Sequence, residues 1–219
     1  MAGSRQRYGI LLLALFATFF FYGVAQPGDL QRTIGTVLVG TTLLLALYAA
    51  KVRPSAMRGA VVVVTAIVVA VIIASLADSE STAAAITAIA SAVMLIVAPT
   101  AVAVGVNRHL QATGVTAVLV AGVLCLYMLF GLFFAFVYVA VENLGGAPFF
   151  ANGASAVPAR AVYFSFVSLA TVGYGDYTAR TNFGHTLSVT EALLGQIYLV
   201  TIVAAIVSRF VALGKWKST

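Results

Sequence analysis

Six long apolar stretches set the strongest limit on how this chain folds. They cover residues 8–25, 33–50, 59–77, 82–105, 114–141 and 183–213. A helix needs about 20 residues to cross the roughly 30 Å hydrocarbon core of a bilayer, and each stretch is long enough. The chain is 62% hydrophobic and only 8% charged, whereas soluble domains carry about 25% charged residues. The pattern predicts an all-α membrane protein with six transmembrane helices.

The first stretch has two interpretations. Arg5 and Arg7 precede it and Gly23-Val24-Ala25 ends it, which is compatible with a cleaved signal peptide. Its apolar run is longer than the 7 to 15 residues usual in a signal, so a retained membrane helix is favoured. The topology of the remaining chain is the same in either case.

Basic residues predict the orientation, because Lys and Arg are enriched in cytoplasmic loops. If both termini are cytoplasmic, most of the basic residues lie inside, and the net charge of +6 follows from topology. Nucleic acid is therefore not an expected partner. The expected location is the plasma membrane, or the inner membrane of a bacterial cell. The residues placed inside are Arg5, Arg7, Lys51, Arg53, Arg58, Arg108, Arg209, Lys215 and Lys217.

Residues that would indicate an enzyme are not grouped in this sequence. The lone cysteine, Cys125, lies within an apolar stretch, so an intrachain disulfide or a zinc cluster is excluded. Neither a nucleophile paired with a base nor a phosphate-binding loop is recognisable. The chain is predicted not to be an enzyme and to need no cofactor.

The region between the last two apolar stretches is built differently from the rest. Residues 142–157 are rich in Gly, Ala, Pro and Asn and predict an extracellular loop. Pro158 then opens a short apolar segment, residues 159–170, that suits a re-entrant pore helix. We expect a four-helix membrane domain over residues 1–112 and a pore domain over residues 113–219.

A glycine-containing hexapeptide, residues 171–176, follows the re-entrant segment with the sequence Thr-Val-Gly-Tyr-Gly-Asp. Non-helical backbone at membrane depth is tolerated only where protein buries it or where it lines a wet cavity. Successive carbonyls that point to one axis can replace the water around a cation without burying full charges. Gly173 and Gly175 allow the dihedral angles that such an arrangement requires.

The hexapeptide resembles the selectivity filter of tetrameric potassium channels. The resemblance covers about the last half of the chain, from Gly114 onward. It implies that K⁺, as the permeant ion, binds the carbonyls of Thr171, Val172, Gly173 and Tyr174 and the Thr171 hydroxyl. It also implies that Gly175 and Asp176 support the filter and that four copies surround one pore. Ala170 replaces a second threonine common in the family, Val167 stands where some relatives carry a carboxylate, and Ala179 lies where a proline is common.

The resemblance also suggests gate and cavity positions in the last helix. Gly195 lies at the family's inner-helix glycine, which serves either as a flexing point or as a packing contact. Gln196, Leu199 and Val203 are expected to line the cavity.

Glu191 is an acid about 12 Å down the same helix. An ionisable group at membrane depth is a candidate functional residue. It is expected either to support the filter by accepting hydrogen bonds from the pore helix or to attract K⁺. The alternative is a buried neutral acid held by Ser or Thr hydroxyls.

Six spans with one pore loop resemble voltage-gated potassium channels, but the fourth stretch, residues 82–105, has no basic residue. A voltage sensor needs several such charges. The predicted function is passive K⁺ conduction through a homotetramer in the bilayer, without intrinsic voltage gating. Two alternatives remain, a non-conducting regulatory subunit and a component of a potassium transporter. The gating stimulus, the resting state and the role of the first four helices are not predicted.

Overall fold

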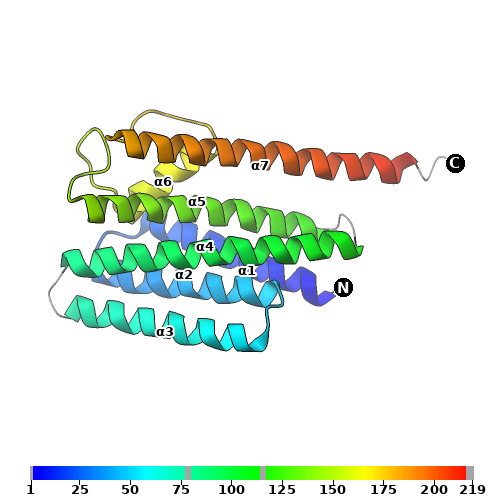
Figure 1. The fold of residues 1–219 in the computed structure, drawn as a ribbon, viewed down its shortest axis with the longest axis horizontal. Helices are drawn as coiled ribbons and strands as arrows, with labels where there is room; N and C mark the ends of the chain where they lie inside the picture. Colours follow the sequence, from blue (N-terminus) through cyan, green and yellow to red (C-terminus); the bar gives the residue numbers. More distant parts are fainter. Residues whose placement is uncertain (1, 77–79, 114–116, 216–219) are drawn as a thin grey trace.

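The described residues form six long helices and one short one (Figure 1). A computed structural model describes residues 2–76, 80–113 and 117–215. The helices are α1 (Ala2–Val24), α2 (Asp29–Ala49), α3 (Pro54–Leu76), α4 (Glu80–Thr113), α5 (Ala117–Gly145), α6 (Pro158–Leu169) and α7 (Asn182–Lys215). The all-helical prediction is confirmed, and α6 matches the expected pore helix to within one residue at each end.

Five helices in the described part of the chain are long and apolar enough to cross a membrane, which supports a multi-pass membrane protein. The candidate spans are Gln6–Val24, Asp29–Ala49, Pro54–Ala74, Ile86–Gln111 and Val118–Gly145. The helix α7 is not among the five, and its side chains from position 205 onward lie outside the described part of the chain. The sixth span therefore stays a prediction.

Two predicted boundaries were wrong because helices continue past the apolar stretches. The fourth apolar stretch was expected to end at residue 105, but α4 runs through Pro99 and Arg108 to Thr113. Glu142 was expected to begin the loop, but α5 continues to Gly145. Continuing the helix keeps backbone groups paired within it, so it extends until another partner for them becomes available.

The end of α2 is a capped turn with an unusual residue. Lys51 has φ 53°, a left-handed conformation that glycine usually provides. The Val52 N–H donates to the Leu47 carbonyl and the Lys51 N–H to the Tyr48 carbonyl, both at 3.2 Å. This pair of bonds is the Schellman motif, which ends the helix and turns the chain into α3.

The long helices pack side by side, and both described ends of the chain lie at the same end of the bundle (Figure 1). The helix α4 packs along α2 and α5, and α3 lies at the edge against α2 and α4. The short helix α6 fits between α5 and α7. In the described structure α7 contacts α5 and α6 among the other helices, which leaves much of its length uncovered.

The first helix packs directly behind the short helix. The Phe19 ring of α1 meets the Phe166 ring of α6 with centroids 4.8 Å apart. The Cys125 thiol, fully buried in α5, donates to the Tyr8 carbonyl of α1 at 3.6 Å. The helix α1 therefore packs against both α5 and α6.

Candidate functional site

The site is built at the C-terminal end of α6, where the helix gives way to the hexapeptide. Pro158 occupies the first turn, where its missing N–H costs nothing. After the last turn, the Val172 and Gly173 N–H groups donate back to the Val167 carbonyl at 2.9 and 3.4 Å. The Thr171 N–H likewise donates to the Ser168 carbonyl at 2.9 Å. The amides of residues 171–173 thus face the helix, and the carbonyls of these residues do not bond to it.

The backbone of the hexapeptide alternates in handedness. Thr171, Gly173 and Gly175 have φ of 56°, 57° and 80°, while Val172 and Tyr174 are absent from the positive-φ residues. In an ordinary extended strand, successive peptide units face opposite sides. Reversing the sign of φ at every second residue turns consecutive carbonyls toward the same side. Within the described residues, no hydrogen bond reaches the carbonyls of residues 171–174.

Aromatic side chains hold the hexapeptide and α6 together on the opposite side. The Tyr174 and Tyr163 rings stack with centroids 6.4 Å apart and planes 10° apart. Phe164 of α6 meets Tyr138 of α5 at 5.2 Å. The Tyr174 ring of the hexapeptide thus lies against α6.

Glu191 of α7 lies at a junction of three helices. It is fully buried, and the Tyr138 hydroxyl of α5 donates to its Oε2 at 2.5 Å. The Ser165 hydroxyl of α6 contacts Glu191 Oε1 and also the Gly131 carbonyl of α5, at 2.6 Å. The Glu191 carboxyl group therefore links α7 to both α5 and α6.

Gly195 and Gln196 bring α7 against the end of α6. A Cβ added at Gly195 would lie 2.6 Å from the Leu169 carbonyl oxygen and 2.8 Å from Leu169 Cδ1. The Gln196 amide donates to the Thr171 hydroxyl at 3.1 Å. The backbone of α7 thus approaches Leu169 closely at Gly195, and α7 continues through this position without a break.

Among the other expected cavity residues, Leu199 is partly exposed on α7. Val203 belongs to α7, but its side chain lies outside the described part. Asp176 follows the last glycine, and its carbonyl accepts a hydrogen bond from Asn152 at 3.2 Å.

Glu142 was not singled out in the sequence, yet it organises the outer loop. Its Oε2 accepts the Phe149 N–H at 2.7 Å and the Ala156 N–H at 2.6 Å. The same loop pairs with the segment after the hexapeptide, where Phe150 bridges Ala179. The sequence did contain a signal for this role, because Glu142 stands next to a loop whose backbone N–H groups need acceptors.

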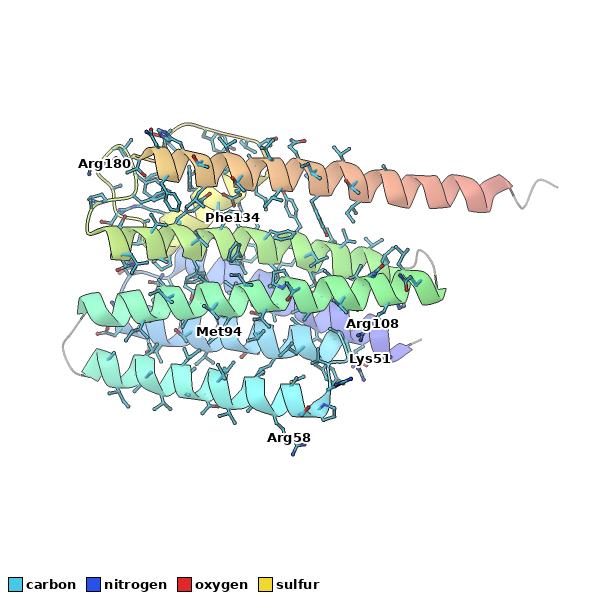
Figure 2. All side chains as sticks on the ribbon, viewed as in Figure 1. Lys51, Arg58, Met94, Arg108, Phe134 and Arg180 are labelled. Atoms are coloured by element: carbon cyan, nitrogen blue, oxygen red, sulfur yellow. The ribbon has the colours of Figure 1, made fainter. Side chains whose placement is uncertain are left out.

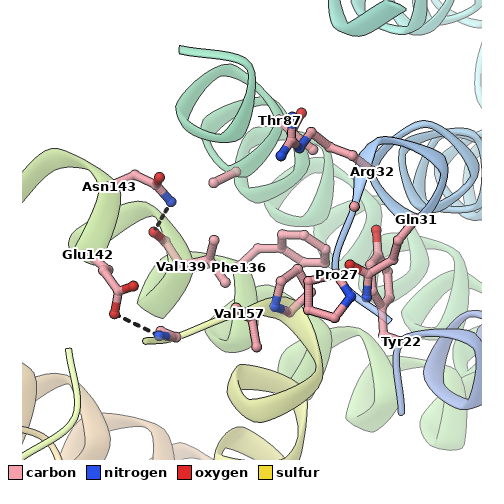
Figure 3. Close-up of a pocket in the computed structure, with 14 residues that line it drawn as sticks. Tyr22, Pro27, Gln31, Arg32, Thr87, Phe136, Val139, Glu142, Asn143 and Val157 are labelled. Atoms are coloured by element: carbon pink, nitrogen blue, oxygen red, sulfur yellow. Dashed lines mark hydrogen bonds between the residues drawn. The ribbon is translucent and has the colours of Figure 1, made fainter. Parts of the chain in front are cut away.

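Glu142 also lines a pocket of about 170 Å³ at the end of the bundle opposite the described start of α1 (Figure 3). Arg32 and Gln31 of α2 face it from the other side, and Asn143 Nδ2 donates to the Val139 carbonyl at 2.7 Å. Within the described residues, no group of three or more His, Cys, Asp or Glu side chains is placed to hold a metal ion.

Comparisons with known proteins agree with this geometry. Residues 122–212 match the family model described as ion channel. The chain is also similar to the probable potassium channel protein 2 of Methanocaldococcus jannaschii, with 35% identity over 57 residues. That match covers 26% of this chain and 16% of the relative, so the chain spans a small part of the relative's length. No solved structure matches.

The matched segment contains most of α5, all of α6, the hexapeptide and most of α7, and the matches indicate a channel rather than an enzyme. Residues 122–212 are therefore similar to the ion-channel family, and the matching relative is a probable potassium channel.

Proposed function

We propose that this chain is one subunit of a potassium-selective channel that conducts K⁺ passively across the membrane. The observation that carries the proposal is the alternation of φ at Thr171, Gly173 and Gly175, which turns consecutive carbonyls to one side. Carbonyl dipoles arranged in this way replace the hydration shell of an ion without burying a full charge.

The proposed K⁺ sites are the carbonyls of Thr171, Val172, Gly173 and Tyr174, together with the Thr171 hydroxyl. Gly175 and Asp176 support the outer end. Two features favour a cation there. The C-terminal end of α6 carries the partial negative charge of a helix end, and the 171–174 carbonyls have no hydrogen-bond donor within the described residues.

A single chain supplies one hexapeptide, so a closed ring needs several copies, and we propose a homotetramer. The uncovered surface supports this. Tyr174 is 71% exposed in the isolated chain, and Val172 is 51% exposed. The uncovered face of α7 continues this apolar surface, with exposed Val189, Leu193, Ile197 and Val200. Such a surface suits neighbouring subunits around the pore.

Both termini are placed in the cytoplasm by the basic residues, with the plasma membrane or a bacterial inner membrane as the location. Gln196, Leu199 and Val203 face the inner cavity in this arrangement. Glu191 is proposed to hold the pore helix in place through Ser165.

Two other functions belong to different classes. A regulatory subunit would share the pore unit but not conduct as a homomer, and a component of a potassium transporter would move K⁺ only as part of a larger assembly. The unbroken hexapeptide favours the self-sufficient channel, because every residue that shapes the carbonyl row is present in this chain.

The test is ion flux into liposomes that contain the purified protein, with K⁺ and Na⁺ compared. Gly173→Asp places a side chain at a positive φ in the hexapeptide and should abolish K⁺ flux. Gly153→Asp is the matched control, since Gly153 also has a positive φ, 80°, and open space around it, but lies in the outer loop. Equal flux of Na⁺ and K⁺, or equal flux in both variants, would contradict a selectivity filter at residues 171–174. Absence of flux in every protein, the unmodified chain included, would favour the regulatory subunit.

A further inference from the structure

A groove with a basic rim lies at the end of the bundle that holds the described start of α1. Its volume is about 380 Å³. Lys51 and Arg53, in the turn between α2 and α3, face Arg108 of α4 across it, and its wall includes Val97, Thr100 and Val104 of α4. Figure 2 shows Lys51 and Arg108 near each other at this end, with Arg58 further out on α3. We call this feature the basic groove.

The charge of the basic groove is unbalanced. None of its lining residues is acidic. The ion pair in the described part of the chain joins Arg32 to Asp29, at the opposite end of α2. No side-chain hydrogen bond or ion pair joins Lys51, Arg53 or Arg108 to another described residue. Three cations thus surround one cavity without a protein partner, which favours an anionic ligand.

The basic groove lies at the depth where a bilayer surface is expected. One candidate span ends at Ala49, two residues before Lys51, and the next begins at Pro54, directly after Arg53. Arg108 lies three residues before the end of the span Ile86–Gln111. The cations therefore mark the level of the lipid headgroups.

The wall of the groove runs from this level into the apolar layer. Val104 lies one turn from Arg108, and Val97 lies about 16 Å from it along the helix, at 1.5 Å per residue. Both side chains are substantially exposed, at 49% and 42%. This combination of a cationic rim and an apolar wall matches the two parts of a phospholipid.

Lys51 adds an observation that is independent of the groove's shape. It occupies the left-handed position of the helix cap, with φ 53°, where glycine avoids the steric strain that a side chain brings. A residue kept in a strained conformation suggests a function for its side chain.

We propose that the basic groove binds an anionic phospholipid, with its phosphate among Lys51, Arg53 and Arg108 and an acyl chain along Val97 and Val104. A soluble phosphate would use the cations alone, and the apolar wall is the reason for assigning a lipid. Because Arg108 lies in the last turns of α4, which leads into α5, a bound lipid would link the α2–α3 turn to the helix that enters the pore unit.

The test is binding of phosphatidylglycerol and phosphatidylcholine with identical acyl chains to the purified full chain, measured by native mass spectrometry. Phosphatidylglycerol should bind more tightly. Arg53→Gln and Arg108→Gln should each weaken it about fivefold, which corresponds to about 1 kcal/mol per charge. Arg58→Gln is the matched control, because Arg58 is a basic residue near the same surface that does not line the groove, and it should change binding less than twofold.

The variant Lys51→Gly distinguishes weaker lipid binding from a less stable fold. Glycine suits the left-handed position, so the melting temperature should stay the same or rise while phosphatidylglycerol binding falls about fivefold. Val104→Ser should weaken lipid binding without affecting inorganic phosphate.

Three results would overturn the proposal. They are equal affinity for the two lipids, equal effects of Arg58→Gln and Arg108→Gln, and competition by inorganic phosphate as strong as that by phosphatidylglycerol. The last would assign the groove to a soluble anion. The measurement reads binding rather than flux, so its outcome does not depend on whether the homomeric protein conducts.

Discussion

The amide of Gln196 in α7 donates a hydrogen bond to the hydroxyl of Thr171 at 3.1 Å. The inner end of the hexapeptide is thereby attached to the long helix that follows it. The bond also fixes which way the Thr171 oxygen faces, because one of its lone pairs is occupied by the amide.

Gln196→Leu should loosen the inner ion site, since the Thr171 hydroxyl is then free to rotate. The lost hydrogen bond between Gln196 and Thr171 contributes about 1 kcal/mol. If this free energy is lost from ion binding, the affinity of an ion at the Thr171 hydroxyl changes about fivefold. Block of K⁺ flux by Ba²⁺ is a suitable measurement, because Ba²⁺ is close to K⁺ in size and competes for the same oxygens. Gln111→Leu, at an exposed position near the end of α4, is the control, and equal Ba²⁺ sensitivity in the two variants would contradict the assignment.

Glu191→Ala should destabilise the protein by about 2 to 4 kcal/mol, because the Tyr138 and Ser165 hydroxyls lose a buried partner. Glu191→Gln keeps an acceptor for Tyr138 and offers an N–H to Ser165, so it should retain most of the stability. Thermal unfolding and K⁺ flux of the two variants provide the comparison. Flux that survives in Glu191→Ala would show that the carboxyl group does not position the pore helix.

Glu142→Ala should loosen the outer loop, because the Phe149 and Ala156 N–H groups lose their common acceptor. The cost is about 1 to 3 kcal/mol for leaving partly buried donors unpaired. Hydrogen exchange of residues 146–157 should become faster, while Glu142→Gln, which retains an acceptor oxygen, should have a smaller effect. Unchanged exchange would mean that the bridge between Phe150 and Ala179 holds the loop by itself.

Gly195→Ala should be destabilising by about 1 to 3 kcal/mol, because the new methyl group would overlap Leu169 at the end of α6. Gly9→Ala offers a contrast within α1, since nothing lies within 4 Å of a Cβ there. Replacing glycine by alanine at an open helical position raises the free energy of unfolding by about 0.5 to 1 kcal/mol. A gain of stability in both variants would exclude close packing at Gly195.

Conductance in liposomes should depend only weakly on voltage. The helix α4 carries Arg108 near its end and no basic residue across its apolar part. Each elementary charge moved through the membrane contributes about 2.3 kcal/mol per 100 mV, so a sensor requires several. Current measured from −100 to +100 mV should change little beyond the driving force, and a steep curve would contradict the prediction.

The helices and the hexapeptide could be predicted because their signals are local. Apolar length identifies a span, and Pro158 marks the start of α6. The helix ends were harder, as Arg108 and Glu142 illustrate, because a helix continues past the apolar layer until its backbone groups find other partners.

The contacts around the site were predictable only in part. Glu191 stood out because an acid in an apolar helix is unusual, but its partner Tyr138 lies 53 positions earlier, and nothing local to Tyr138 distinguishes it from other tyrosines. The basic groove depends on two segments joined only by the fold. Contacts of this kind can be predicted only when the arrangement of the helices is known, and the residue pattern of a single segment does not reveal that arrangement.

The contact between Phe19 and Phe166 has a consequence for biosynthesis. The helix that backs the pore helix leaves the ribosome before its partner, which follows roughly 150 residues later, a delay of about 7 to 30 s at ordinary translation rates. During that interval one face of α1 has only lipid or neighbouring helices to cover it. The pore unit therefore reaches its final packing only when α6 has been made and packs against α1.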